Sequence, residues 1–120
     1  MKNQETIRFA LFSEVFAAIA HPKRLEIIHY LGEGQKTASE LTELTGMSKA
    51  NVSQHMNILK ARGLVHCDKC GTFCHYRLTS PKVLEVCEIV RELILDQMQI
   101  TAHNHAVLST VVTLHKKGTA

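Results

Sequence analysis

The apolar residues near the start of the chain recur at helical spacing. Ile7, Leu11 and Val15 follow one another every four positions, which predicts a helix over residues 5–20. His21-Pro22 ends this helix, because proline disfavours helical geometry in the residue before it and fits the first turn of a following helix. A second helix is therefore predicted over residues 22–31.

Two shorter helical segments follow. Thr37 and Glu40 have the spacing of a capping box, which predicts the start of a third helix. Gly46-Met47-Ser48 is typical of a tight turn, and Ser48 can cap a fourth helix. Two helices joined by a three-residue turn that contains glycine form a helix-turn-helix, here over residues 38–62.

After Gly63 the pattern changes from helical to extended. Residues 64–68 and 72–78 are predicted strands. Cys70-Gly71 is the predicted turn between them, because glycine tolerates positive φ. This hairpin over residues 64–78 is the predicted wing.

The last part of the chain is strongly apolar. Ser80-Pro81 begins a further helix whose apolar positions cover more than one face, and the tail from Gln97 either continues it or forms a sixth helix. So broad an apolar surface on a small protein favours burial against a second chain. Residues 1–20 and 81–115 are therefore the predicted dimerisation helices. The predicted fold is mainly α with a small β-hairpin: a dimeric winged helix-turn-helix with five or six helices.

Length and composition fit that fold. The chain has 120 residues, which suits a single domain over residues 1–120. Hydrophobic residues make up 45% and charged residues 21%, so the chain does not have the composition of a disordered protein. The net charge of +3 permits an anionic partner such as nucleic acid. With no signal-like start and no apolar run that could span a bilayer, we expect a cytoplasmic protein without membrane contact.

Three runs of sequence stand out, namely FAAIAHPKRLEIIHYL, ASELTELTGMSKANVSQHMNILKARGLV and GTFCHYRL. Together they resemble the ArsR/SmtB family of small dimeric transcriptional repressors. The most specific part is Val52-Ser53-Gln54-His55-Met56, followed by Leu59 and Gly63-Leu64-Val65. One departure is His21, where the family usually has an acidic residue, and this weakens the expected cap of the second helix. The resemblance implies a homodimer that binds an inverted repeat in double-stranded operator DNA and is released by an inducer.

The fourth helix also suits DNA when it is considered alone. Its non-core face carries donors and acceptors for base edges and phosphates and no acidic residue. The alternatives are an ordinary solvated surface and, for Ser53, local bonding to the helix backbone. His55 could contact phosphate or close the helix-turn-helix core. The predicted DNA contacts are Ser48, Lys49, Asn51, Ser53, Gln54, His55, Asn57 and Lys60, with Lys69 and Thr72 of the wing.

Three of the four cysteines lie in one stretch of the wing, HCDKCGTFCH. With Cys70-Gly71 in the turn, Cys67 is predicted directly opposite Cys74 on one face, and His66 opposite His75 on the other. Directly opposed Cβ atoms lie about 4.5–5.5 Å apart, so the two thiols could share a soft metal or approach disulfide distance. In a reducing compartment, clustered cysteines more often form a metal or redox site than a structural disulfide.

Three interpretations of these cysteines stay open. The first is an inducer site for a soft metal or metalloid: Cys67, Cys70 and Cys74 suit As(III), and Cys87 or a histidine as a fourth ligand suits Zn(II) or Cd(II). The second is a thiol-redox or reactive-sulfur switch, and the third is that the cysteines are inert.

No cofactor is obligatory in any of these interpretations. The predicted function is a DNA-binding repressor released by an inducer that the wing cysteines sense. One alternative is a winged helix without a sensor, with an architectural or interaction role. The other is a thiol enzyme, which is disfavoured because no acidic orienter, cofactor loop or pocket signal accompanies the neighbouring cysteines and histidines. His103 and His105 are two positions apart and do not share a helix face, and His115 lies far along the axis, which favours solvated side chains over a metal site within one chain. A metal site across a dimer stays open as an alternative for these histidines.

Overall fold

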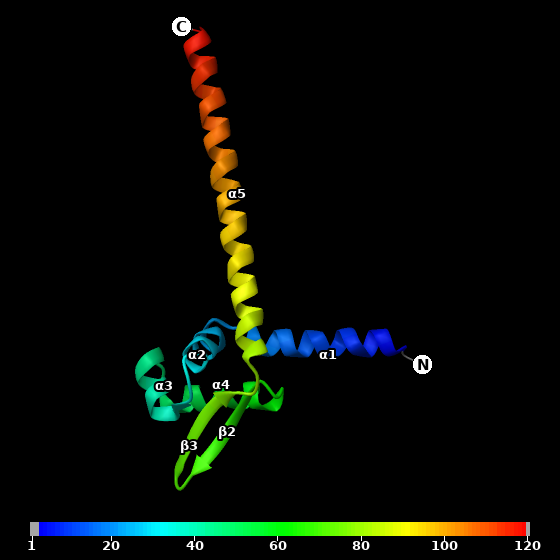
Figure 1. Cartoon of the computed structure of the whole chain (residues 1–120), viewed down its shortest axis with the longest axis vertical. Helices are drawn as coiled ribbons and strands as arrows, with labels where there is room; N and C mark the ends of the chain where they lie inside the picture. Colours follow the sequence, from blue (N-terminus) through cyan, green and yellow to red (C-terminus); the bar gives the residue numbers. More distant parts are fainter. Residues whose placement is uncertain (1–2, 120) are drawn as a thin grey trace. The chain divides into compact units, whose positions relative to one another are not determined.

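The computed structural model describes the backbone of residues 3–119 and the side chains of residues 3–109. The elements follow in the order α1 (Gln4–Ile19), α2 (Pro22–Gly32), β1 (Lys36–Thr37), α3 (Ala38–Thr45), α4 (Lys49–Ala61), β2 (Val65–Cys70), β3 (Phe73–Leu78) and α5 (Pro81–Thr119) (Figure 1). This confirms the predicted winged helix-turn-helix. The described part has five helices, because the tail continues α5 instead of forming a sixth.

The chain divides into two compact units, Met1–Glu85 and Val86–Ala120. The first unit contains the helix-turn-helix, the wing and α1. The second consists of α5 from Val86 onward. No helix among the described residues is both long enough and apolar enough to cross a bilayer.

Side chains cap the first two helices. Asn3 Oδ1 accepts a hydrogen bond from the backbone N–H of Thr6 at 2.9 Å and so begins α1. His21 Nδ1 accepts from the backbone N–H of Lys23 at 3.0 Å and begins α2. The imidazole of His21 thus caps α2, although the sequence predicts a weakened cap at this position.

The two helices of the helix-turn-helix begin as predicted. Thr37 and Glu40 form both halves of the capping box at the start of α3, and the backbone N–H of Thr37 lowers the pKa of the Glu40 carboxyl by donating to it. Gly46 has a φ of +71°, a left-handed conformation that glycine adopts without steric cost. Ser48 then caps α4 by accepting from the N–H of Asn51 at 3.2 Å.

The core of the first unit lies between α2, α3 and α4. Its fully buried large side chains are Ile27 and Ile28 of α2, Leu41 of α3, and Val52, Met56 and Leu59 of α4. Full burial of one such side chain stabilises the fold by about 1.5–3 kcal/mol. The buried residues of α4 follow helical spacing, so the opposite face of α4 stays in solvent.

The wing belongs to a three-stranded antiparallel sheet with the order β1-β3-β2. The short strand β1, which was not predicted, places Lys36 opposite Tyr76 and Thr37 opposite His75. Because Thr37 also caps α3, this pairing joins the wing to the first helix of the helix-turn-helix.

The predicted register of the wing is wrong by two residues. Cys67 lies opposite Tyr76 and Lys69 opposite Cys74, so Cys67 and Cys74 are not directly opposed. His66 lies opposite Arg77, not His75, which faces Asp68. The strand bounds also differ from the prediction, because β2 extends to Cys70 and the two residues of the turn are Gly71 and Thr72.

The conformation of the turn explains the difference. A two-residue turn at Cys70-Gly71 of the type I′ would need positive φ at both residues, whereas a type II′ turn needs it only at its first. Gly71 has a φ of +66°, and no other residue type has positive φ in the described part of the chain. The hairpin therefore turns where glycine takes the first central position.

Candidate nucleic-acid interface

The exposed face of α4 carries the predicted DNA contacts. All but one of the predicted contacts on α4 and its cap are exposed, and the exception is the half-buried His55. The exposed residues are Ser48, Lys49, Asn51, Ser53, Gln54, Asn57 and Lys60 of α4 and its cap, and Lys69 and Thr72 of the wing. Ser53 makes no hydrogen bond to the backbone through its side chain among the described residues. The face is therefore available to a partner.

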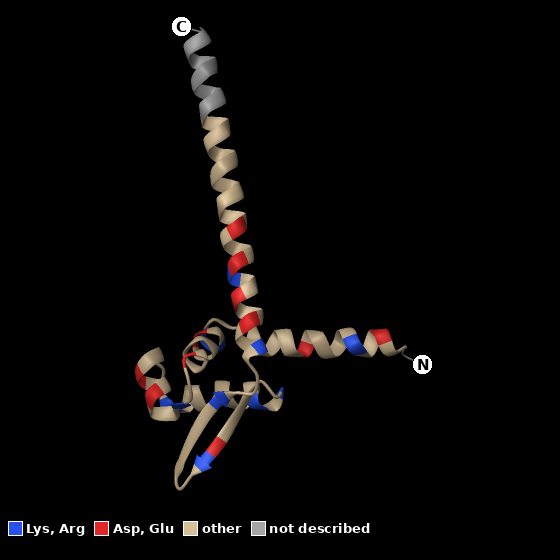
Figure 2. Cartoon of the chain, viewed as in Figure 1, with Lys and Arg blue, Asp and Glu red and all other residues tan. Residues whose placement is uncertain are grey.

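The charges of this face favour an anion. Lys49 and Lys60 lie near the two ends of α4, and α4 itself has no acidic residue. Figure 2 shows the basic residues along α4 and in the wing, while the acidic residues of the helix-turn-helix lie on α3. Lysine side chains of this kind contact phosphates without reading sequence, whereas amides such as Asn51 and Gln54 can read base edges.

His55 faces inward, toward α2. Its ring lies 4.6 Å from the ring of His21, centroid to centroid, and its Nδ1 lies 3.3 Å from Arg24 Nη1. Because a guanidinium can only donate, Nδ1 of a neutral His55 is the acceptor. Arg24 also donates to the backbone carbonyl oxygens of Ala17 and Ala18 at the end of α1.

This His55 junction joins the end of α1, the start of α2 and the middle of α4. Burial lowers the pKa of His55, and the nearby His21 and Arg24 lower it further. Of the two roles predicted for His55, the position favours the structural one.

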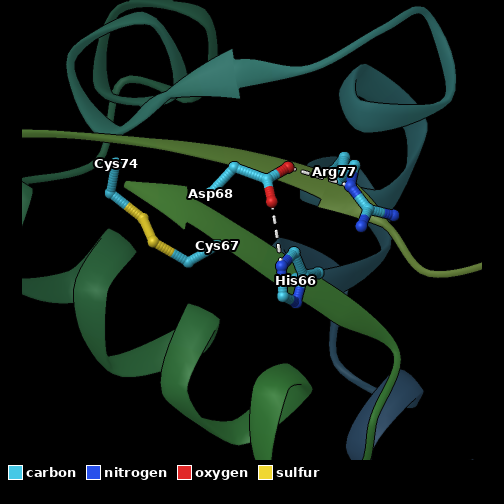
Figure 3. The surroundings of a disulfide bond; sticks show 5 residues. All are labelled: His66, Cys67, Asp68, Cys74 and Arg77. Atoms are coloured by element: carbon cyan, nitrogen blue, oxygen red, sulfur yellow. Dashed lines mark hydrogen bonds and ion pairs between the residues drawn. A yellow bond between two sulfur atoms is a disulfide. The ribbon is translucent and has the colours of Figure 1, made fainter. Parts of the chain in front are cut away.

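One face of the wing holds a small ion-pair network. Asp68 accepts from Arg77 Nε at 2.9 Å through one carboxylate oxygen, and its other oxygen lies 2.9 Å from His66 Nε2 (Figure 3). The hydrogen bond from Arg77 lowers the pKa of Asp68. All three side chains are about half exposed, so the network orders the surface of the wing more than it stabilises the fold.

Cys67 and Cys74 form a disulfide between β2 and β3 (Figure 3). Their Cα atoms are 5.7 Å apart, within the range of about 4.4–6.8 Å in which disulfides form. The bond is diagonal, since Cys67 pairs with Tyr76, two residues beyond Cys74. The predicted and observed registers differ by two residues, and side chains alternate between faces with a period of two. Both registers therefore place Cys67 and Cys74 on the same face of the wing.

The other two cysteines are free thiols. Cys70 lies opposite Phe73 and thus on the other face of the wing from the disulfide. Cys87 lies in the second unit, where partial burial, and then the charge of Glu88, raise the pKa of its thiol. Among the described side chains, no three histidine, cysteine or acidic residues are grouped so that they could hold a metal ion. His103 and His105 are exposed, and the side chain of His115 lies outside the described residues.

Sequence reasoning missed a cleft beside the disulfide. Thr37, Ser39 and Tyr76 line it together with residues of α4 and of the wing. These residues come together through the pairing of β1 with β3. A two-residue strand carries no periodic signal, so the cleft could not be found from the pattern of the chain.

Comparisons with known proteins agree with this geometry. The family model described as "Bacterial regulatory protein, arsR family" matches residues 21–66. An HTH-type transcriptional regulator of Methanocaldococcus jannaschii is 33% identical over 82 residues, which cover 68% of this chain and 92% of the relative. The transcriptional repressor SdpR of Bacillus subtilis is 35% identical over 68 residues, covering 57% of this chain and 76% of the repressor.

The fold is shared with solved structures. The homodimeric winged helix-turn-helix DNA-binding domain of Mb0332 from Mycobacterium bovis superimposes with a TM-score of 0.74. It is 23% identical, and the match covers 82% of this chain and 91% of that domain. The element order β2-β3 after a helix-turn-helix is therefore that of a known winged helix.

Proposed function

Because the chain belongs to the arsR family of bacterial regulatory proteins, we propose that it is a homodimeric repressor whose affinity for operator DNA depends on the redox state of Cys67 and Cys74. The family and the named relatives are transcriptional regulators, so the chain is a regulator and not an enzyme. In this proposal α4 enters the major groove and the wing contacts the DNA backbone.

The observation that carries the sensing role is the disulfide across the wing. Disulfides are rare in reducing compartments, and those found there are usually transient and serve catalysis or redox sensing. Hydrogen peroxide would remove two electrons and two protons from the two thiols, forming the S–S bond and being reduced to two molecules of water. Thiols would reverse the reaction by exchange.

The bond connects directly to the DNA-binding surface. It links β2 to β3, and the wing carries the predicted backbone contacts Lys69 and Thr72. A covalent diagonal link fixes the twist of the hairpin, whereas the dithiol leaves the twist free to adapt to the DNA. Allosteric couplings of about 1–3 kcal/mol are typical, and about 1.4 kcal/mol changes affinity tenfold. We take the dithiol as the bound form and the disulfide as the released form.

Dimerisation would use the exposed apolar residues of α1 and α5. On α1 they are Ile7, Phe9, Leu11, Phe12 and Phe16; on α5 they include Ile89, Val90, Leu93, Ile94 and Met98. Exposed apolar surface this extensive is unusual on a monomer and marks an interaction site. A homodimer that buries it presents two copies of α4 to an inverted repeat.

A soft metal or metalloid is the second candidate inducer. Cys67 and Cys74 are close enough that, once reduced, both thiolates could bind one ion. Cys70 lies on the opposite face of the wing, so a third thiolate would require the tip to rearrange. The redox interpretation needs no such movement, and we prefer it for that reason.

Selection of binding sites from random duplexes by the reduced protein tests the DNA-binding part of the proposal. We expect enrichment of a palindromic sequence with half-sites about one DNA turn apart. An enriched pool without a repeat, or no enrichment, would contradict the proposal. Affinity of the oxidised and reduced protein for the selected duplex tests the redox part.

A further inference from the structure

A cleft of about 460 Å³ opens between the wing, the start of α3 and the start of α4. Volumes of about 300–1,000 Å³ are usual for small-molecule sites. The wing contributes Thr72, Phe73, Cys74 and Tyr76, and the rest of the lining is Thr37, Ala38, Ser39, Lys49 and Ser53. Cys74 lines the cleft and its disulfide partner Cys67 does not. A small molecule in the cleft would therefore lie against Cys74 and not against Cys67.

The lining is suited to an anion. Lys49 is its one charged residue, it has no ion-pair partner among the described residues, and no carboxylate lines the cleft. The hydroxyls of Ser39, Ser53 and Tyr76 donate no hydrogen bond within the described part of the chain, so they remain available to a ligand.

Glu40, which follows the lining residue Ser39 in the sequence, has a carboxylate that is already engaged. Thr37 donates to Glu40 Oε1 through its backbone N–H at 3.0 Å and through its hydroxyl at 3.1 Å. One carboxylate oxygen of Glu40 therefore faces Thr37, and the Thr37 hydroxyl is already engaged as a donor. Lys49 thus remains the dominant charge for a ligand that enters the cleft.

We propose that this cleft binds a small thiol that carries a carboxylate and directs its sulfur to Cys74 of the disulfide. The inference rests on the proposed redox function and adds to it the class of reductant and the sulfur that is attacked. Lys49 holds the carboxylate, and the hydroxyls of Ser53 and Tyr76 complete the polar contacts.

The reaction is a pair of thiol–disulfide exchanges. The thiolate of the ligand attacks Cys74 Sγ, a new S–S bond forms between them, and Cys67 leaves as a thiolate. A second thiol attacks the ligand's sulfur in this mixed disulfide, releasing the small-molecule disulfide and the thiolate of Cys74. Two small thiols have then supplied the two electrons that reduce the protein.

The same cleft links the chemistry to DNA binding. Lys49, Ser53 and Thr72 line the cleft and also belong to the predicted DNA contacts. A ligand held there, or attached to Cys74 as the mixed disulfide, competes with phosphate for Lys49. Operator DNA should therefore slow the reduction of the disulfide by the anionic thiol.

Three two-carbon thiols of different charge test the ligand class: thioglycolate, 2-mercaptoethanol and cysteamine. The oxidised protein is mixed with each thiol, the reaction is quenched with acid, and the free thiols are alkylated. Mass spectrometry then follows the loss of the disulfide. Rates are divided by thiolate concentration, because the three thiols differ in pKa. We expect a preference for thioglycolate over 2-mercaptoethanol that falls about threefold in Lys49→Gln, as for loss of one exposed ion pair.

Lys60→Gln is the matched control, since Lys60 lies on α4 but does not line the cleft. Lys60→Gln should keep the wild-type preference for thioglycolate. In the wild type and in Lys60→Gln, 1 M salt should weaken that preference. An equal preference in wild type and Lys49→Gln, or equal changes in the two variants, would overturn the role of the cleft.

The site of attack is read from the trapped intermediate. With thioglycolate at a limiting concentration, we expect the mixed disulfide on Cys74 and the alkyl group on Cys67. Mixed disulfide on Cys67, or on both residues equally, would overturn the proposed direction. These outcomes do not depend on DNA: if the exchange occurs as described but reduction leaves operator affinity unchanged, the redox function fails while the cleft assignment stands.

Discussion

Cys67 and Cys74 are bonded diagonally across the wing, because the backbone register places Tyr76, and not Cys74, opposite Cys67. We expect a covalent bond between β2 and β3 to restrict how far the two strands twist about one another. The wing is the part of the fold that lies beside the DNA backbone in our proposal. The two cysteines are therefore placed where a change in bonding alters the shape of a binding surface.

Asn51 and Gln54 are the residues we expect to read bases. Replacing either with alanine should weaken binding to the selected operator by about 1–3 kcal/mol and leave binding to unrelated duplexes nearly unchanged. Lys60→Ala is the comparison, since loss of a phosphate contact weakens both. Fluorescence anisotropy on both duplexes measures this, and equal losses on every sequence for all three variants would remove the base-reading role.

The His55 junction predicts a dependence of stability on pH. Burial, His21 and Arg24 hold the pKa of His55 below its usual value of 6.5 in the folded protein. The unfolded chain therefore binds the proton more readily, and stability should fall as pH drops below about 6.5 and level off once the folded pKa is passed. The groups facing His55 are Arg24 of α2 and His21, which caps that helix.

Thermal unfolding between pH 5 and pH 8 measures this effect. His55→Gln should unfold with a smaller loss of Tm toward low pH than the wild type, because the titrating group is gone. His29→Gln is the control: His29 is exposed, and its only ion-pair partner within the described residues is Glu33 at 3.6 Å. If His55→Gln loses as much Tm as the wild type on acidification, the junction does not carry the pH dependence.

Assembly can be tested apart from DNA. Leu93 is 56% exposed on α5, and we expect Leu93→Asp to shift a micromolar sample from dimer to monomer in sedimentation velocity. Far-UV circular dichroism provides the control that the helices remain formed. Glu92→Asp adds no charge and should stay dimeric. A wild-type protein that sediments as a monomer with and without DNA would contradict the dimer.

The number of thiols bound by arsenite separates the redox and metalloid candidates. Because Cys70 lies on the opposite face of the wing, we expect arsenite to protect no more than two thiols of the reduced protein. Cys70→Ser should then respond to every agent as the wild type does. Protection of three thiols in the wild type and two in Cys70→Ser would instead favour the soft-metalloid site.

The helices could be predicted because their signals are local. Thr37 with Glu40, Ser48 and Pro22 each mark a helix start through contacts within a few residues. The exposure of the predicted DNA contacts followed from the same periodicity, since Val52, Met56 and Leu59 fix which face of α4 is buried.

What could not be predicted depends on contacts between distant segments. The inward position of His55 requires Arg24 and His21, which lie more than 30 residues earlier in the sequence. The strand β1 has two residues and exists only because it pairs with β3. The register of the wing depended on whether Gly71 takes the first or the second place in the turn, and Cys70 decides this because it does not adopt positive φ.

Affinity for the selected operator in the oxidised and reduced states tests the central claim most directly. Fluorescence anisotropy should give an affinity about tenfold weaker for the peroxide-treated wild type than for the reduced protein, as a coupling of about 1.4 kcal/mol predicts. Cys67→Ser and Cys74→Ser should bind like the reduced wild type before and after peroxide, while Cys70→Ser and Cys87→Ser should still respond. If the wild type and the two wing variants Cys67→Ser and Cys74→Ser respond identically to peroxide, the wing disulfide is not the sensor.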